Sequence, residues 1–364
     1  MNFLFSQFPA LEKKIAHVPL GCFPTPVVRM EQMEKIFKGG SFYLKNDGSS
    51  GALYGGNKIR KLEYLLGDVL RKKTKEILTF GAAGSNHALA TAVYANQYNI
   101  PCTAMLIAQP NADYVRQNLK YSHASYSKLR HYNSEKAMYI PLAVRMIKRF
   151  VTSGKLPYII WPGGSAPLGT IGYVNAALEL KDQIDKSLLP VPDKIYVPMG
   201  TMGTAVGLAI GLKAAGLKTQ VVAVRVVEAH MGNEKKFQAL YRKTLALLRS
   251  CDPKFPHLNY DQSDVDITHD FFGEKYALFS KRGMAAVELL KEKQGIQLEG
   301  TYTGKALSAL IHNATASEFK DEVVLFWNTY NSIDFSEAIK GVDYKELPIP
   351  FHRYFEEDVQ PLDR

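Results

Sequence analysis

The sequence predicts an α/β protein built from two open, twisted, mostly parallel sheets with helices on both faces. Short apolar runs rich in β-branched residues alternate with longer segments of helical spacing, which is the pattern of repeated β-α-β units. Turns of small residues separate several of these strands from the helix that follows. The 364 residues exceed the length of one typical domain, so we expect two domains.

The β-α-β alternation follows a lead-in of irregular sequence. The expected strands are 41–45, 76–80, 102–107, 158–161, 194–198, 221–227 and 323–327, and the expected helices are 58–70, 85–98, 113–120, 142–152, 171–183, 205–214, 233–249, 283–293 and 305–313. A glycine-rich connection at 161–173 marks the expected domain junction. We therefore predict a small α/β domain over 56–165 and a large domain that combines 1–55 with 166–364.

Composition and charge narrow the class of protein. The three cysteines are widely separated and odd in number, which argues against a disulfide framework or a zinc cluster and favours a reducing, cytoplasmic compartment. No apolar run approaches the ~20 residues that span a bilayer, and the N-terminal segment lacks the pattern of a signal peptide. The net charge is +10, but the basic residues are dispersed, so neither a nucleic acid nor a membrane is the expected partner.

The segment GGNKIRKLEYLL at 55–66 carries the first candidate site residues. Two glycines deliver Lys58 to the start of a helix, and Lys61 follows three residues later, on a neighbouring position of the helix. An amine held at a buried, positively biased helix start has a depressed pKa, as an amine nucleophile needs. Taken alone, the segment favours a solvated lysine at the start of an ordinary helix, because most lysines are solvated; the other motifs of the chain change that balance.

Three segments share one design, in which a strand is followed by a glycine turn and a helix N-terminus. They are 55–58, 81–87 and 200–204. Such turns lie at the carboxyl ends of parallel strands, where ligands bind in open α/β sheets. Their backbone N–H groups, together with the helix dipole, favour anions.

The third turn is the best candidate for a phosphate site. Its residues are Gly200, Thr201, Met202, Gly203 and Thr204. The segment matches neither the GxGxxG fingerprint nor a P-loop, because its glycines fall at 200, 203 and 207 and no GK[ST] follows. A dinucleotide site remains an alternative, since Glu228 ends the next strand 21 residues after Gly207.

The second turn and a late loop offer further polar groups. Ser85 is placed to cap a helix, but a cap leaves Asn86 and His87 unassigned, and these side chains suit a carboxylate or a polar ring substituent. Tyr302, in the loop TYTGK, is either a catalytic phenol or a packed aromatic residue. No GxSxG elbow supports a serine hydrolase, and no His/Cys spacing indicates a metal site.

Five motifs together resemble one family. They are GGNKIRKLEYLL at 55–66, GSNHALATAVYA at 84–95, GGSAPLGTIGYVNAALEL at 163–180, GTMGTAVGLAIGL at 200–212 and TYTGKA at 301–306. This set resembles the pyridoxal-phosphate enzymes of the tryptophan-synthase-β fold (fold type II), in the branch of D-cysteine desulfhydrase and 1-aminocyclopropane-1-carboxylate (ACC) deaminase. The similarity extends from about residue 23 to residue 331.

The resemblance implies pyridoxal 5′-phosphate as cofactor and a role for each matching residue. Lys58 matches the lysine that binds the cofactor covalently, and Lys61 matches a lysine near its phosphate. Asn86 matches the asparagine that hydrogen-bonds the 3′-oxygen, the segment 200–204 matches the phosphate loop, and Thr329 lies in the loop that faces the pyridine ring. The family also implies a homodimer.

The resemblance further implies the groups that meet a small amino-acid substrate. Ser85 matches the residue that holds the substrate carboxylate and assists proton transfer, and Tyr302 matches the active-site tyrosine. Asn86, His87 and Thr303 complete the expected substrate pocket.

Two hydroxyls separate the activities of this branch. ACC deaminases usually carry a glutamate after the tyrosine and a leucine in the loop after the last core strand, where this chain has Thr303 and Thr329. A carboxylate facing the pyridine nitrogen favours its protonation, whereas a hydroxyl is a weaker partner. We therefore favour β-elimination on a small D-amino acid such as D-cysteine, with pyruvate, ammonia and sulfide as products.

The chain departs from the family pattern at two places. The usual glycine pair after Thr329 is replaced by Tyr330 and Asn331, and the helix after the SNH motif continues as 88–91, ALAT, without the usual arginine and glutamine. Both departures touch the expected pocket. ACC deaminase, or another lyase or racemase on the same cofactor, is therefore the enzymatic alternative, and a non-catalytic binding protein is the alternative of another class.

Overall fold

Two separate sheets form the framework of the chain in the computed structural model, which describes residues 1–316 and 319–363. The first has six strands in the order β1-β2-β10-β7-β8-β9, and the second has four in the order β5-β4-β3-β6. Among the paired strands of the described residues, only β1 and β2 run antiparallel. The strands are β1 (Val27–Arg29), β2 (Ser41–Asn46), β3 (Ile77–Ala82), β4 (Cys102–Ile107), β5 (Lys128–Tyr132), β6 (Tyr158–Ile160), β7 (Lys194–Met199), β8 (Gln220–Arg225), β9 (Val265–Thr268) and β10 (Val323–Asn328).

Helices connect the strands of both sheets. They are α1 (Phe3–Gln7), α2 (Pro9–Lys14), α3 (Glu31–Phe37), α4 (Lys58–Arg71), α5 (Asn86–Gln97), α6 (Asp113–Ala124), α7 (Glu135–Ser153), α8 (Pro167–Asp185), α9 (Gly203–Ala214), α10 (Glu234–Cys251), α11 (Lys281–Gln294), α12 (Thr303–Thr315), α13 (Ser336–Ile339) and α14 (Arg353–Glu356). The α/β class expected from the sequence is thus confirmed. None of the described helices is long and apolar enough to cross a membrane.

The chain divides into two compact units. Unit 1 comprises 1–64 and 165–333, and unit 2 comprises 65–164 and 334–364. The division falls within α4 and within the glycine-rich connection at 161–173. The C-terminal segment 334–364, which the sequence analysis grouped with the large domain, lies in unit 2.

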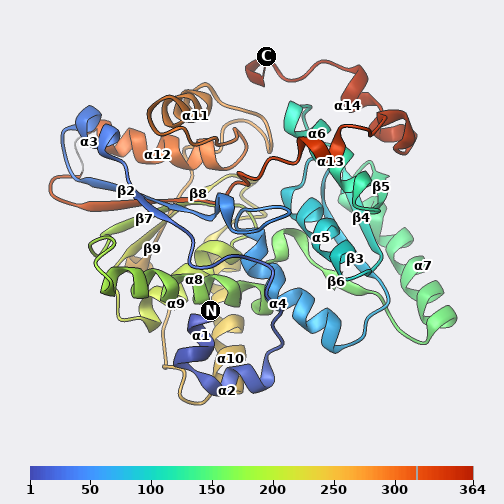
Figure 1. The fold of residues 1–364 in the computed structure, drawn as a ribbon, viewed down its shortest axis with the longest axis horizontal. Helices are drawn as coiled ribbons and strands as arrows, with labels where there is room; N and C mark the ends of the chain where they lie inside the picture. The colour runs from blue at the N-terminus through green and yellow to red at the C-terminus, as the bar shows by residue number, and fades with distance from the viewer. Residues whose placement is uncertain (317–318, 364) are drawn as a thin grey trace. The chain divides into compact units, whose positions relative to one another are not determined.

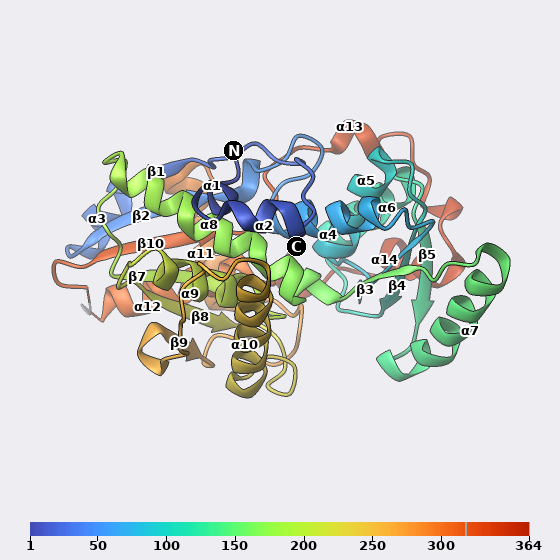
Figure 2. The same cartoon turned by 90° about the horizontal axis from the view of Figure 1, so that it is seen from below.

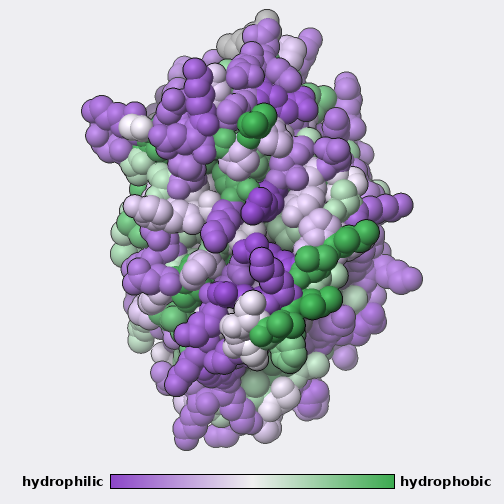
Figure 3. Space-filling model, turned by 90° about the vertical axis from the view of Figure 1, so that its right-hand side faces the viewer, coloured by the Kyte–Doolittle hydropathy of each residue, from purple (hydrophilic) through white to green (hydrophobic). Residues whose placement is uncertain are grey.

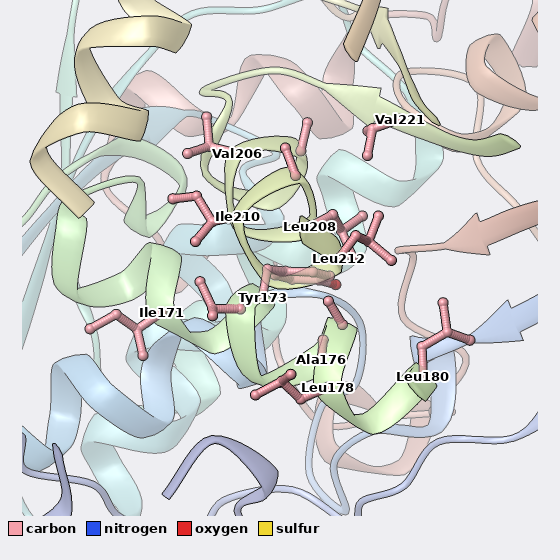
Figure 4. Close-up of a cluster of buried hydrophobic side chains, with 14 of the residues drawn as sticks. Ile171, Tyr173, Ala176, Leu178, Leu180, Val206, Leu208, Ile210, Leu212 and Val221 are labelled. Carbon is pink, nitrogen blue, oxygen red and sulfur yellow. The ribbon is translucent and has the colours of Figure 1, made fainter. Parts of the chain in front are cut away.

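In unit 1, helices cover both faces of the six-stranded sheet. Figure 1 shows α8 and α9 along one face and α11 and α12 along the other. The pair α8 and α9 packs closely because small residues meet at their contact, and apolar side chains of both helices fill the space next to β8 (Figure 4). A Cβ atom on Gly207 of α9 would lie 2.4 Å from the Cβ of Tyr173 in α8. This core fixes the start of α9, where the predicted phosphate loop ends.

In unit 2, the four-stranded sheet is fully parallel and α7 packs beside its β5 edge (Figure 2). Met138 of α7 joins Leu78, Phe80 and Met105 in a small core on that side. The C-terminal segment is tied to the start of α6, because the Asn111 side chain donates to three backbone carbonyls of 354–358. These bonds explain why 334–364 belongs to this unit.

The outward face of α7 carries a row of exposed apolar side chains, visible in Figure 3. Ile140, Val144, Ile147 and Val151 follow the four-three-four spacing of one helix face, and each is more than half exposed. The helix begins seven residues before the expected 142, at Glu135, because Ser134 caps it by accepting the Ala137 N–H at 3.3 Å. A contiguous apolar row of this kind is unusual on a protein surface.

Candidate functional site

The turn at 55–57 delivers Lys58 to the first position of α4. Its three backbone N–H groups each have a partner: Gly55 donates to the side chain of Asn331 at 2.6 Å, Gly56 to the carbonyl of Asp47 at 2.8 Å, and Asn57 to the carbonyl of Thr329 at 3.1 Å. Buried N–H groups left without partners are costly, so these bonds define one conformation of the turn. The sequence prediction that a glycine turn places Lys58 at a helix start is confirmed.

A buried ion network anchors the same helical turn. The guanidinium of Arg60 donates to both carboxylate oxygens of Asp47, at 2.7–3.0 Å, and to both oxygens of Glu179 in α8, at 2.8–3.0 Å. Lys45 also pairs with Glu179. The indole N–H of Trp327 and the phenol of Tyr173 donate to the Oδ2 atom of Asp47 at 2.8 and 2.5 Å. The first turn of α4 is therefore held on two sides, by β2 with its following turn and by α8.

The loop 200–204 lies against this helix start. The Asn57 side chain donates to the hydroxyl of Thr204 at 3.0 Å. Ser165 links the loop to Lys61: its hydroxyl lies 3.3 Å from the Lys61 amine and 2.7 Å from the Thr201 hydroxyl, and it accepts the Gly203 N–H at 3.1 Å. A Cβ on Gly203 would lie 3.0 Å from the Lys61 amine. The predicted phosphate loop and Lys61 thus form one cluster.

The start of α9 favours an anion at this cluster. Met202, its N-cap, has a left-handed backbone with φ 67° and provides no side-chain cap. Backbone N–H groups at an uncapped helix start, with a lysine amine beside them, are the donors that bind phosphate in many proteins.

The two lysines of this helix start have lowered pKa values. Burial lowers the pKa of the Lys58 amine to about 8, against a smaller opposing effect of the Glu299 carboxylate. Burial also lowers the pKa of Lys61, and the neighbouring Lys58 charge adds to that effect. A neutral amine is the form that attacks a carbonyl, so Lys58 has the property expected of a nucleophile.

Glu299 organises the loop that carries Tyr302. Its buried carboxylate accepts the backbone N–H groups of Thr301, Tyr302 and Thr303 at 2.7–2.8 Å. The phenol of Tyr302 is hydrogen-bonded to that of Tyr276, whose pKa is raised by burial to about 12. Tyr302 also borders the phosphate loop, because a Cβ on Gly200 would lie 3.5 Å from its ring.

The two threonines that suggested the activity occupy different surroundings. The Thr303 hydroxyl lies 3.2 Å from a carboxylate oxygen of Glu299 and accepts the Glu299 N–H at 3.1 Å, so it is bonded within its own turn. Thr329 follows β10 and accepts the Asn57 N–H through its carbonyl. Contact of either hydroxyl with a ligand stays a prediction.

The remaining predicted residues lie in unit 2. Ser85 is the N-cap of α5 and accepts the Ala88 N–H at 3.2 Å, as its position indicated. Asn118 of α6 donates to the side chain of Asn86 at 2.8 Å and to the carbonyl of Gly84 at 2.9 Å. His87 is buried at 2 % exposure. Unit 2 therefore holds its three site residues on one ordered turn, and unit 1 holds all the others.

Sequence reasoning missed four residues that shape these clusters: Ser165, Tyr276, Glu299 and Asn118. Each acts through contacts that only the tertiary structure reveals, apart from Glu299, which precedes TYTGK by two residues. Glu299 lies three residues before Tyr302, the N-cap of α12, which is outside the positions of the usual helix-start signals, so no local pattern identified it.

Comparison with known proteins decides the family. A family model described as pyridoxal-phosphate dependent enzyme matches residues 18–329. The chain belongs to this family. It is 32% identical over 331 residues to a D-cysteine desulfhydrase of Klebsiella pneumoniae, covering 89% of this chain and 94% of that one. It is 30% identical over 330 residues to the D-cysteine desulfhydrase of Serratia proteamaculans, covering 88% and 96%.

A solved structure supports the same assignment. The chain is similar to a crystal structure of an ACC deaminase homologue with a TM-score of 0.76 and 26% identity, covering 93% of this chain and 99% of that one. The family and the fold type II architecture expected from the sequence motifs are confirmed. The protein is a pyridoxal-phosphate-dependent enzyme, and this family assignment replaces the dinucleotide alternative.

The residues of unit 1 fit this cofactor. Lys58 offers an amine of lowered pKa for the aldehyde, and the start of α9, whose N-cap Met202 makes no side-chain bond, offers donors for the phosphate together with Lys61. Within residues 1–316 and 319–363, no group of three His, Cys, Asp or Glu side chains is arranged to hold a metal ion.

Proposed function

We propose that this enzyme catalyses β-elimination of a small D-amino acid, with D-cysteine as the preferred substrate and pyruvate, ammonia and hydrogen sulfide as products after water is added. The main support is the cluster of Lys58, Lys61 and the loop 200–204, which combines an amine of lowered pKa with an anion site. The similarity to two D-cysteine desulfhydrases supports the choice of substrate.

Lys58 has two tasks in this proposal. It holds the cofactor, and once the substrate amine has taken its place, it accepts the α-proton. The cofactor supplies an electron-withdrawing ring that stabilises negative charge at the substrate α-carbon. A pKa of about 8 lets the Lys58 amine be neutral in a useful fraction near neutral pH and still bind a proton.

Lys61 and the loop 200–204 hold the phosphate in this proposal. Ser165 orients both, since its hydroxyl contacts the Lys61 amine, Thr201 and the Gly203 N–H. By holding the phosphate, these residues would keep the cofactor within reach of the Lys58 amine, which is the alignment that proton abstraction requires.

Tyr302 is proposed to move a proton at the substrate side chain. Its hydroxyl shares a hydrogen bond with Tyr276, and Glu299 fixes its backbone. The burial that raises the pKa of Tyr276 keeps that phenol protonated, so it can donate to Tyr302 when Tyr302 gives up its proton. Thiolate departure from the β-carbon would be assisted by this donor.

The hydroxyls of Thr303 and Thr329 favour elimination over ring opening. A hydroxyl stabilises a protonated pyridine nitrogen less than a carboxylate does. Elimination needs only loss of the α-proton and a good leaving group, so it tolerates the weaker partner. In unit 2, Asn86 is proposed to bond the cofactor's 3′-oxygen, and Ser85 and His87 to bind the substrate carboxylate.

ACC deaminase is the second candidate, and it is supported by the similarity to the solved homologue. The two are separated by turnover of D-cysteine, D-serine and ACC by the purified holoenzyme, with pyruvate as the readout. We expect D-cysteine to give the highest kcat/KM. Faster turnover of ACC would replace the proposal with its alternative, and a yellow protein that turns over no amino acid would support a binding protein.

We further propose a cytoplasmic homodimer. The three cysteines are all free, which is usual in a reducing compartment. The exposed apolar row on α7 is a surface of the type that mediates association. Light scattering of the purified protein tests the dimer, and a monomeric mass at micromolar concentration would contradict it.

A further inference from the structure

The loop after β10 contacts the turn that delivers Lys58. Of the three N–H groups in the turn 55–57, two donate to this loop: Gly55 to the Asn331 side chain and Asn57 to the Thr329 carbonyl. The two segments lie so close that a Cβ on Gly56 would be 2.7 Å from the Thr329 carbonyl oxygen. Gly56 has φ +87°, which a residue with a side chain rarely adopts.

Asn331 is itself held in one orientation. Its Oδ1 accepts the Ile333 N–H at 3.1 Å in addition to the Gly55 N–H, and its Nδ2 donates to the Ile333 carbonyl at 2.9 Å. These three bonds fix which end of the amide is oxygen. The side chain is 8 % exposed, so water does not readily replace it as the acceptor for Gly55.

The residue that makes this contact lies where the sequence departs from the pattern of the family that it resembles. The motifs at 55–66 and 301–306 match the family, but the family's glycine pair after Thr329 is replaced here by Tyr330 and Asn331. A glycine at 331 has no side-chain acceptor to offer the Gly55 N–H. Asn331 in place of glycine therefore adds a hydrogen bond between the loop after β10 and the turn 55–57, besides changing the expected substrate pocket.

We propose that Asn331 is a positioning residue for Lys58, which acts by accepting the Gly55 N–H and so fixing the turn that places the lysine amine. The part of this inference that concerns catalysis rests on the proposed function; the part that concerns the turn does not. Because Thr329 belongs to the same loop, Asn331 also fixes the position of Thr329 relative to the turn that carries Lys58. The segment NTYN at 328–331 thus supports the turn that carries Lys58.

Three variants test the proposal. Asn331→Ala removes the acceptor, whereas Asn331→Asp keeps a carboxylate oxygen for the Gly55 and Ile333 N–H groups. Asn175→Ala is the matched control, because Asn175 is a buried asparagine of unit 1 that accepts a backbone N–H, from Leu4 at 2.9 Å, away from the turn.

The first readout is amide hydrogen exchange of the turn in protein stripped of cofactor. We expect Asn331→Ala to speed exchange at Gly55 by about tenfold or more, because its closed state loses a buried hydrogen bond. Asn331→Asp should remain within about threefold of wild type. Asn175→Ala should change exchange around Leu4 and leave Gly55 unchanged.

The second readout is the binding of pyridoxal phosphate and the pH midpoint for reaction of the Lys58 amine. Asn331→Ala should weaken the binding of pyridoxal phosphate about tenfold and change the pH midpoint of Lys58 reactivity. Asn331→Asp should restore the binding. Asn175→Ala should change neither the binding nor the pH midpoint. Equal exchange at Gly55 in wild type and Asn331→Ala, or equal effects of Asn331→Ala and Asn175→Ala, would overturn the proposal.

One measurement needs no variant, so a failure of Asn331→Ala to fold does not remove the test. In the wild-type protein without cofactor, the Gly55 amide should exchange as slowly as the hydrogen-bonded amides of the second turn of α4, 62–65. Exchange at the rate of an open loop would overturn the inference. Loss of the proposed function is recognised separately, as a wild-type protein that turns over no amino acid although Gly55 is protected.

Discussion

Two cations on one turn of α4 have opposite environments. Arg60 is surrounded by the carboxylates of Asp47 and Glu179, which raise its pKa well above the usual value although burial alone would lower it. Lys58, two residues earlier, has no ion-pair partner in the described part of the chain, and burial lowers its pKa to about 8. Arg60 therefore stays charged, whereas Lys58 loses its proton more readily than an ordinary lysine.

The difference shows how the fold separates anchoring from chemistry. The ion pairs of Arg60 hold the helix start from two sides, and Glu179 remains ionised because Arg60 and Lys45 lower its pKa to about 2, against the effect of burial. The carboxylate that opposes the lowering of the Lys58 pKa is Glu299, whose own pKa is raised by burial. The Lys58 amine thus lies on a helix start that the ion pairs of Arg60 hold in place, but it takes no part in those ion pairs.

Lys58→Ala should have the largest effect on activity. The substitution removes both the covalent attachment of the cofactor and the base, so turnover should fall by at least about 1000-fold, and the yellow absorbance at about 410–430 nm should be lost. Steady-state assays and a visible spectrum check this. Retained turnover would refute the role of Lys58, while the melting temperature shows whether the fold survives.

Arg60→Met should have the largest effect on stability. It leaves Asp47 and Glu179 buried without their main partner, which costs about 3–5 kcal/mol. Urea denaturation measures this cost. The control is Arg353→Met, which breaks an exposed pair with Glu357 and should leave the midpoint unchanged. Similar midpoints for both variants would show that the network does not anchor the helix.

Ser165→Ala should have a smaller and more selective effect. Its hydroxyl contacts Lys61 and two groups of the loop 200–204, so the affinity for pyridoxal phosphate should fall about three- to tenfold, while that for pyridoxal, which lacks the phosphate, should not change. Ser308→Ala, a buried serine of α12 away from the loop, is the control. An equal loss for both ligands would place the role of Ser165 elsewhere.

The sequence predicted the interior strands and the edge strand β6, and it missed the other three edge strands. The central strands β7 and β10 begin at the predicted residues, Lys194 and Val323. The three strands that were not predicted, β1, β5 and β9, all lie at the edge of a sheet. An edge strand pairs on one side only and tolerates charged residues, as in KLRHY of β5, so no apolar run marks it.

The site was predicted to the extent that it is local. The glycine turns and the lysines of α4 are visible in consecutive residues, and the family motifs added roles to them. Ser165 and Tyr276 contribute through bonds to residues 26–104 positions away, which no local pattern specifies. The function of Asn331 is of the same kind, since its partner Gly55 is 276 residues distant.

The most direct test of the central claim is the pH dependence of Lys58 reactivity in protein freed of cofactor, followed at this residue by mass spectrometry with an amine-reactive label. A lowered pKa means that the neutral amine predominates above about pH 8, so the rate should rise about tenfold per pH unit below that value and level off above it. An exposed lysine on the same protein, Lys186, provides the reference. A Lys58 midpoint near 8 is the predicted result, and a rate that still climbs past pH 10, as for an ordinary lysine, would contradict the account.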